Sequence, residues 1–220
     1  GKINDMENIV IIGAGGFGRE VKMLIDQINE GSLQYNLLGF YDDSVQKGTV
    51  VFGLEVLGSV EELNQVTKPT AISIAIGSPK VKKDIKDKLS NPMLSFPRLI
   101  HPSVVLGIPS ETIGIGAIIC AGTIITVNIT IGEFVILNLG CTVGHDTVIG
   151  NYCSFMPQSN IAGEVILGEA VYVGMGVGII NQVTVGNNVT LGAGSVVVKN
   201  ISSNCLAVGI PAKVIKEYEE

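Results

Sequence analysis

A period of six residues runs through the second half of the chain. Every sixth position from Ile113 to Val197 is apolar, and glycine follows this position in eight of the fifteen hexads. An amphipathic helix repeats every 3.6 residues and a half-buried strand every two, so neither explains a strict period of six. The repeat predicts a solenoid of short strands, because no hexad can bury its apolar face without neighbours stacked on it.

A second position in each hexad supports this prediction. The residue four places after each large apolar one is small or β-branched, from Ala117 at the start to Ile201 at the end. One large and one small inward side chain fill a narrow interior, and glycine or another compact residue lets the chain turn a tight corner. No loop interrupts residues 113–202, and IHPSVV with LGIPSET predicts one irregular coil before them.

The first hundred residues follow a different pattern. ENIVIIGAGGFGREVKMLIDQI is typical of a buried strand, a glycine turn and a helix. NLLGFYDD and AISIAIGSP predict two further strands, a lysine-rich helix follows, and SFPRLI predicts a fourth strand. Alternating strands and helices favour a small parallel sheet with helices on its faces. We therefore expect two domains, an α/β domain over residues 1–98 and the solenoid over residues 99–220.

The glycine turn holds Gly13, Gly15 and Gly18 in the pattern GxGxxG. Backbone N–H groups at such a turn and helix N-terminus bind phosphate. Asp42 and Asp43 end the second strand, where a dinucleotide fold keeps its ribose-binding acid. A full dinucleotide domain needs two βαβαβ halves, and only about one fits before the hexads begin. We therefore favour a site that binds one nucleoside diphosphate and does not bind NAD. The alternatives are an NAD site and a purely structural turn.

Composition limits the partners of the chain. The formal net charge is −6, and the lysines of VKKDIKDK alternate with aspartates. Such a surface does not neutralise nucleic-acid phosphates. The mean hydropathy of +0.47 is high, yet no run approaches the roughly 18 apolar residues that a membrane helix needs. We expect no nucleic-acid partner and no membrane insertion, and we assign the apolar excess to a continuous core or a subunit interface.

The hexads resemble those of the hexapeptide-repeat acyltransferases, in which an aliphatic residue, glycine, two variable residues and a small residue recur. The resemblance implies a left-handed parallel β-helix with three hexads in each 18-residue coil, and hence five coils here. GAGGFG, a strand ending in DD, an IAIG strand, IHP and then unbroken hexads are similar to one group of this family across essentially the whole chain. That group comprises sugar acetyltransferases of the sialic-acid O-acetyltransferase and bacillosamine N-acetyltransferase type.

Ligands and assembly follow from this resemblance. In the group, the α/β domain binds a nucleotide-linked amino sugar, and the β-helix binds acetyl-coenzyme A in a cleft between the subunits of a homotrimer. Transferred by motif, the sugar nucleotide would contact Gly15, Gly16, Phe17, Asp42, Asp43 and Gly77. The coenzyme would contact Ser154, Met175 of VGMG, Ala193 of LGAG and Lys213 of the terminal VGIPAK, although Lys213 could equally be an ordinary surface lysine.

The motif GHDTVIG carries the candidate catalytic residue, His145. His145 takes the third place of its hexad, which faces outward, so a plain surface histidine is one interpretation. In the resembling family, HD followed by VIG marks the catalytic base, and neutral imidazole suits proton removal near neutral pH. Asp146 could orient the ring if a corner brings the two side chains together, since neighbours in a straight strand point to opposite faces. Asn138, seven residues upstream, is a candidate for positioning the substrate.

Ser154 is a departure from the family pattern. The family often carries a second histidine nine residues after the first, where it contacts the coenzyme, and this chain has Ser154 there. A hydroxyl could still donate a hydrogen bond, so we keep Ser154 among the expected coenzyme contacts.

The cysteines and histidines predict no metal site. Cys120, Cys141, Cys153 and Cys205 lack metal-binding spacing, which is typical of reduced, buried thiols and a cytoplasmic protein. Cys141 and Cys153 take the small inward position, so packing explains them better than a role as nucleophile. His101 and His145 are 44 residues apart, a separation that does not stack them in 18-residue coils.

These observations lead to one hypothesis of function. We expect an enzyme of glycan biosynthesis that moves acetyl from acetyl-CoA directly to the amino group of a nucleotide-linked 4-amino-4,6-dideoxy sugar. His145 would be the general base. The alternatives are O-acetylation of sialic acid on the same scaffold, a non-catalytic sugar-nucleotide-binding protein, and an NAD-linked enzyme.

Overall fold

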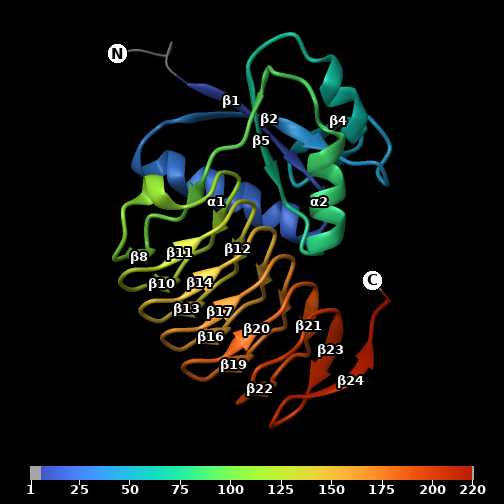
Figure 1. Cartoon of the computed structure of the whole chain (residues 1–220). Helices are drawn as coiled ribbons and strands as arrows, with labels where there is room; N and C mark the ends of the chain where they lie inside the picture. Colours follow the sequence, from blue (N-terminus) through green and yellow to red (C-terminus); the bar gives the residue numbers. More distant parts are fainter. Residues whose placement is uncertain (1–5, 220) are drawn as a thin grey trace.

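The computed structural model describes residues 6–219 of the chain. Residues 1–5 and 220, the outer ends of the two predicted domains, lie outside the described residues. An α/β part is stacked on the first coils of a β-helix, and the later coils project away from it (Figure 1). No helix within residues 6–219 has the length and apolar character required to cross a membrane.

The α/β part contains a six-stranded sheet in the order β3-β4-β2-β1-β5-β6. Its pairs are parallel except for the β3–β4 hairpin. β1 lies in the middle, with Ile9 to Ile12 buried on both faces, as expected of a central parallel strand. The elements are β1 (Glu7–Ile12), α1 (Gly16–Gly31), β2 (Tyr35–Tyr41), β3 (Val50–Val51), β4 (Leu54–Gly58), the 3₁₀ helix η2 (Val60–Gln65), β5 (Thr70–Ile74), α2 (Pro79–Lys88) and β6 (Leu94–Ser95).

The predicted fourth strand over SFPRLI is misplaced. Ser95 ends β6, and Leu99 and Ile100 form β7, which pairs with the β-helix strand β9 rather than with the α/β sheet. Pro97 lies between the two strands and has no N–H to donate, which favours a break in the pairing there. The segment therefore connects the two parts of the molecule.

The β-helix has three faces of short parallel strands. We call them the first, second and third face in the order in which each coil visits them. The first face holds β7 (Leu99–Ile100), β9 (Ile118–Ile119), β12 (Ile136–Leu137), β15 (Ser154–Phe155), β18 (Tyr172–Val173), β21 (Val189–Leu191), β23 (Cys205–Val208) and the antiparallel β24 (Lys213–Glu217). The second face holds β8 (Val105–Leu106), β10 (Ile124–Ile125), β13 (Thr142–Val143), β16 (Asn160–Ile161), β19 (Gly178–Ile179) and β22 (Val196–Val197). The third face holds β11 (Thr130–Ile131), β14 (Val148–Ile149), β17 (Ile166–Leu167) and β20 (Thr184–Val185), and a 3₁₀ helix, η3 (Ser110–Thr112), precedes the regular coils.

The register of the coils confirms the predicted period. Ile118 pairs with Ile136 and Ile136 with Ser154, so each coil contains 18 residues. All fifteen large hexad positions from Ile113 to Val197 belong to one buried cluster. The small positions are buried as well, including the polar Thr147. The predicted fold, a small α/β domain followed by a left-handed parallel β-helix, is confirmed.

The α/β part covers the start of the first face. The outward side chains of Ile118, Ile136 and Ser154 are fully buried there, whereas Tyr172, further along the same face, is partly exposed. Ile118 and Ile136 join one apolar cluster with α1 and the sheet. This packing fixes which face of the β-helix is turned toward the α/β part.

Candidate functional site

His145 and Asp146 lie together at the corner between the second and third faces, which we call the second corner. The side chains are 58% and 45% exposed, and His145 Nδ1 lies 2.8 Å from Asp146 Oδ2. Asp146 adopts a left-handed backbone conformation with φ of +60°, so the chain turns sharply and two consecutive side chains meet. The corner on which the sequence argument for Asp146 depended is therefore present.

This contact orients the imidazole ring. A carboxylate only accepts hydrogen bonds, so Nδ1 carries the proton of the neutral ring and Nε2 keeps its lone pair. The arrangement is that of a base held in one tautomer by a carboxylate. The pair can therefore accept a proton at Nε2 and stabilise the resulting imidazolium.

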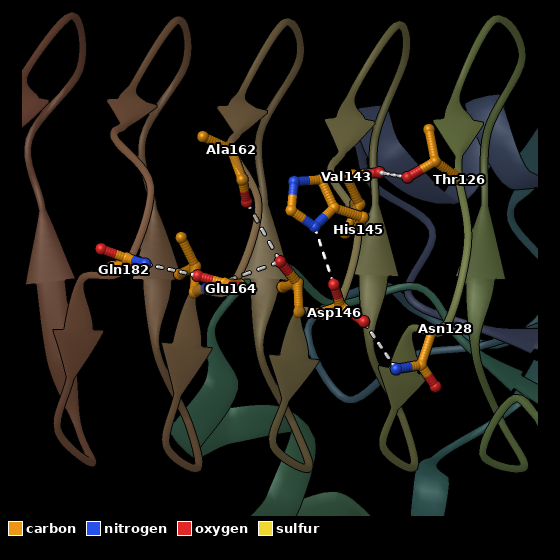
Figure 2. A network of polar contacts seen from close by, with 10 residues as sticks. Thr126, Asn128, Val143, His145, Asp146, Ala162, Glu164 and Gln182 are labelled. Carbon is orange, nitrogen blue, oxygen red and sulfur yellow. Dashed lines mark hydrogen bonds and ion pairs between the residues drawn. The ribbon is translucent and has the colours of Figure 1, made fainter.

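Asp146 is itself held by the preceding coil. Asn128 Nδ2 donates to Asp146 Oδ1 at 2.6 Å. This hydrogen bond, followed by the bond from His145, holds the pKa of the Asp146 carboxyl below its ordinary value. Glu164 and Gln182 take the same place in the next two coils and contact each other at 2.6 Å, away from the imidazole (Figure 2).

A cavity of about 330 Å³ opens where β1 and β2 end. Gly13, Asp42 and Asp43 line it together with residues of α2, among them Val81 and Lys88. The backbone itself requires glycine at position 13. Its φ of +102° and the nearby Ala75 carbonyl, which a Cβ would approach to 2.9 Å, both require glycine. The sequence predicts the lysine-rich helix that forms α2 but not its place at this cavity, because the lysine–aspartate alternation resembles a fully solvated face.

Both aspartates bind backbone N–H groups. Asp42 accepts from Ala14 N through Oδ2 at 2.8 Å and from Ser44 N through Oδ1 at 2.7 Å. Asp43 Oδ1 accepts from Val60 N at 2.8 Å. Asp42 thus fixes the glycine turn as well as facing the cavity.

The other predicted sugar-nucleotide residues lie in two places. Gly15 and Gly16 are exposed at the start of α1, and Gly16 lines a separate groove with Phe52. Phe17 is half-buried and packs against the cluster between sheet and β-helix. Gly77 follows β5, and a Cβ there would lie 3.7 Å from Met156 of the β-helix. These residues surround the glycine turn, although only Gly13 of that turn lines the cavity.

Asn138, Met175 and Ala193 share another corner, between the first and second faces, which we call the first corner. Met175 and Ala193 are exposed and lie one coil apart, joined by the bond from Gly194 N to Met175 O at 2.8 Å. Asn138 is 5% exposed, and its Oδ1 accepts from Leu139 N at 2.7 Å. Lys213 begins β24 and is exposed. The side chain of Asn138 thus supports the corner from inside.

Ser154 does not lie on an open surface. Its side chain has no exposure, and its Oγ lies 2.8 Å from Lys82 Nζ of α2. A coenzyme molecule cannot reach this hydroxyl without displacing Lys82. We expected a coenzyme contact at Ser154 from the sequence, which does not reveal that α2 covers this residue.

Within residues 6–219, the cysteine thiols and the side chains that could bind a metal form no second reactive site. Burial raises the pKa of Cys141 and of Cys153 to about 11 and that of Cys120 to about 12, which keeps these thiols protonated near neutral pH. Across residues 6–219, no three His, Cys, Asp or Glu side chains gather in a way that could hold a metal ion.

Comparisons with known proteins agree with both halves of this description. Residues 8–89 match the family model of the PglD N-terminal domain, and residues 164–199 match that of the bacterial transferase hexapeptide repeats. The chain is 31% identical to GDP-perosamine N-acetyltransferase of Escherichia coli O157:H7 over 185 residues, which cover 84% of this chain and 82% of that protein.

Solved structures extend the likeness over the whole fold. PerB from Caulobacter crescentus, in complex with CoA and GDP-perosamine, is 31% identical with a TM-score of 0.81, covering 95% of this chain and 97% of that one. The acetyltransferase domain of PglB from Neisseria gonorrhoeae, in complex with acetyl coenzyme A, is 28% identical with a TM-score of 0.83, covering 96% and 100%.

Fold and site together define a class, the acetyl-CoA-dependent acyltransferases built from hexapeptide repeats. Within that class, the chain belongs to the sugar N-acetyltransferases in which a PglD N-terminal domain precedes the β-helix. The family and the acetyl-CoA donor expected from the sequence are thereby confirmed.

Proposed function

We propose that this enzyme transfers acetyl from acetyl-CoA to the amino group of a nucleotide-linked 4-amino-4,6-dideoxy sugar, with His145 as general base. The observation that carries the proposal is the contact between His145 Nδ1 and Asp146, which leaves Nε2 available on an exposed corner. The relatives named for GDP-perosamine support an aminated sugar nucleotide as acceptor.

The proposed reaction is a direct transfer. The sugar nitrogen forms a bond to the acetyl carbon, the bond from that carbon to sulfur breaks, and coenzyme A leaves. His145 Nε2 takes the proton that the nitrogen gives up, and Asp146 stabilises the imidazolium that forms. The protonated thiols described above are poor nucleophiles, so a covalent acetyl-cysteine step has no candidate residue among them.

We further propose a homotrimer with each site between two subunits. Within one chain, His145 lies on the second corner, while Met175, Ala193 and the α/β part lie at the first corner and the first face. The second face separates them and carries a cleft of about 430 Å³ that Asn160 and Ile180 help to line. A second copy would bring its first corner to the His145 of its neighbour, since a cyclic trimer joins two different surfaces at each interface.

The two ligands divide the remaining residues. We propose the Asp42 and Asp43 cavity for the nucleotide, with Gly15, Gly16, Phe17 and Gly77 shaping its surroundings. Asn138 acts by holding the corner beside the sugar. Met175, Ala193 and Lys213 are proposed coenzyme contacts, and Ser154 would act only through Lys82.

We place the domain boundary between residues 98 and 99. We place the protein in the cytoplasm, where buried free cysteines such as these stay reduced.

Release of coenzyme A tests this function. Purified enzyme is mixed with acetyl-CoA and, separately, with UDP-, dTDP- and GDP-linked 4-amino-4,6-dideoxy sugars, with their 4-hydroxy counterparts and with sialic acid. We expect thiol release with at least one amino sugar and none with its hydroxy counterpart. Turnover of sialic acid alone would contradict the proposal in favour of O-acetylation. Nucleotide-sugar binding without turnover would contradict it in favour of a binding protein.

A further inference from the structure

The imidazole of His145 rests on the next coil of the β-helix. Strand β13 pairs with β16 so that Thr142 lies opposite Asn160 and Val143 opposite Ile161. Continuing this register by two residues brings Gly163 opposite His145, at the same place of the second corner one coil later. The coil backbones are a strand spacing apart, about 4.8 Å, so the imidazole lies where a side chain of residue 163 would be.

Gly163 has no room for a side chain while the ring is in this position. A Cβ built on Gly163 would come closer than 3.0 Å to three atoms of the His145 ring, Nε2, Cε1 and Cδ2, a separation that real Cβ atoms essentially never show. No other group lies among the three nearest atoms. The ring therefore lies against the backbone of Gly163.

The backbone at this place does not itself demand glycine. Gly163 is not among the residues with positive φ, and the left-handed turn of this coil is made by Glu164, with φ of +57°. The corresponding places in the neighbouring coils hold Val127 and Asn181. The corner thus accepts side chains wherever no imidazole leans across from the coil before.

We propose that Gly163 is a positioning residue for His145. Its missing side chain lets the imidazole lie across the coil with Nδ1 on Asp146 and with Nε2 beside the backbone of Gly163. An alanine would push the ring out of this rotamer and separate it from Asp146, because an exposed side chain moves more readily than a hydrogen-bonded backbone. The catalytic consequence rests on the proposed function, while the structural statement does not.

The tautomer of the ring gives a test that does not need turnover. The chain has two histidines, and their contacts predict opposite tautomers. His145 carries its proton on Nδ1. His101 Nδ1 accepts from Ser103 N at 3.0 Å, so its proton sits on Nε2 and faces Gln27 Oε1. Long-range ¹H–¹⁵N spectra of the side chains distinguish these forms, and His101 serves as an internal reference.

The experiment compares wild type, Gly163→Ala and the control Gly31→Ala, where a new Cβ would have nothing within 4 Å. We expect Gly163→Ala to convert His145 from the Nδ1–H form to a mixture of both tautomers and to leave His101 unchanged. With the acceptor sugar identified, kcat should fall about tenfold, because one pKa unit of lost stabilisation is a factor of ten. Both KM values should stay within about twofold of wild type. Gly31→Ala should match wild type throughout.

A double variant separates positioning from a need for glycine in the backbone. In the His145→Ala background the imidazole is gone, so Gly163→Ala should leave the melting temperature unchanged. An equal loss of melting temperature, or failure to fold, in both backgrounds would overturn the proposal. An unchanged His145 tautomer in folded Gly163→Ala would also overturn it. If wild type acetylates no sugar but the tautomer shift occurs, the proposed function fails and the positioning role stands.

Discussion

Two polar contacts of the β-helix, half a coil apart, have opposite characters. His145 and Asp146 form an exposed contact at the second corner, with a carboxylate as partner. Ser154, nine residues later, lies on the first face under α2, where it meets Lys82, which is 1% exposed. The hexad register predicts an outward position for both His145 and Ser154. What each can do is decided by what covers its face.

Of the two contacts, the one made by Lys82 costs more free energy of desolvation. Its Nζ has only uncharged partners, Ser154 Oγ at 2.8 Å and the Cys153 carbonyl at 3.4 Å. Burial lowers the pKa of Lys82 from 10.5 to about 7, because the charged form loses its hydration. The contact joins α2, which lines the proposed nucleotide cavity, to the β-helix, so it fixes the relative position of the two parts. Replacing each member tests which contact serves chemistry and which serves architecture.

The largest effect is expected at the exposed contact. His145→Ala should lower kcat by about 10²- to 10⁴-fold, the usual contribution of a general base. Its melting temperature should stay close to wild type, since the side chain is mostly exposed. Steady-state kinetics and thermal melting measure both. A variant of His101, which is anchored to Gln27 and Ser103, should instead lose stability and keep its rate per folded molecule.

The buried contact of Lys82 should make the free energy of unfolding depend on pH. The folded pKa of Lys82 is lowered to about 7, so between pH 7 and 10.5 the unfolded chain binds more protons and stability from this group rises with pH. Below pH 7 both states are protonated and the contribution is constant. Lys82→Met should remove a rise of up to about 4 kcal/mol over this window.

Urea unfolding at pH 7 and pH 9.5 measures this difference. The raised pKa values of Tyr35, Tyr41 and the cysteines act in the opposite direction, so the comparison must be wild type minus variant rather than wild type alone. Equal pH slopes for wild type and Lys82→Met would show that the amine is not buried as described.

A smaller effect is expected from the partner of His145. Asp146→Asn keeps the size of the side chain but loses its charge, and we expect kcat to fall about tenfold, as for one pKa unit of charge stabilisation. The loss should be larger than that of Glu164→Gln, a matched change one coil later that does not touch the imidazole. Equal losses in the two variants would remove Asp146 from the mechanism.

The smallest effect is expected from Asn128. The hydrogen bond from its side-chain amide is the main cause of the lowered pKa of Asp146. Asn128→Ala should therefore raise that pKa toward its ordinary value. At pH 7 the carboxylate stays ionised, and kcat should change by about twofold at most because the contact is exposed and screened. Carboxyl titration by NMR measures the shift. A pKa of Asp146 that does not move would contradict the contact.

The sequence predicted the repeat of the β-helix better than it predicted which segments pack against the β-helix. The period of six determines the inward positions from Ile113 to Val197, because each coil must bury a face against the next. It also predicts the outward direction of His145. The left-handed φ at Asp146 belongs to the same repeat, because it recurs at six-residue steps, for example at Tyr152 and Gln158.

The sequence pattern did not predict the contacts between segments that are far apart along the chain. The sequence pattern of the α2 lysines is typical of a solvated face, yet Lys82 is buried and Lys88 borders the proposed nucleotide cavity. The segment SFPRLI was predicted as one strand, yet Pro97 divides it between two sheets. In each case the outcome depends on which surface packs against which, and a local pattern does not contain that information.

The most direct test of the shared site is complementation between two inactive variants. His145→Ala removes the proposed base, and Val81→Trp fills the proposed nucleotide cavity from an exposed position on α2. Each variant alone should be inactive. Trimers assembled from equal amounts of both should recover about a quarter of wild-type activity, because one interface in four then joins an intact His145 to an intact cavity. Mixed trimers with no activity would contradict a site completed between two copies of the chain.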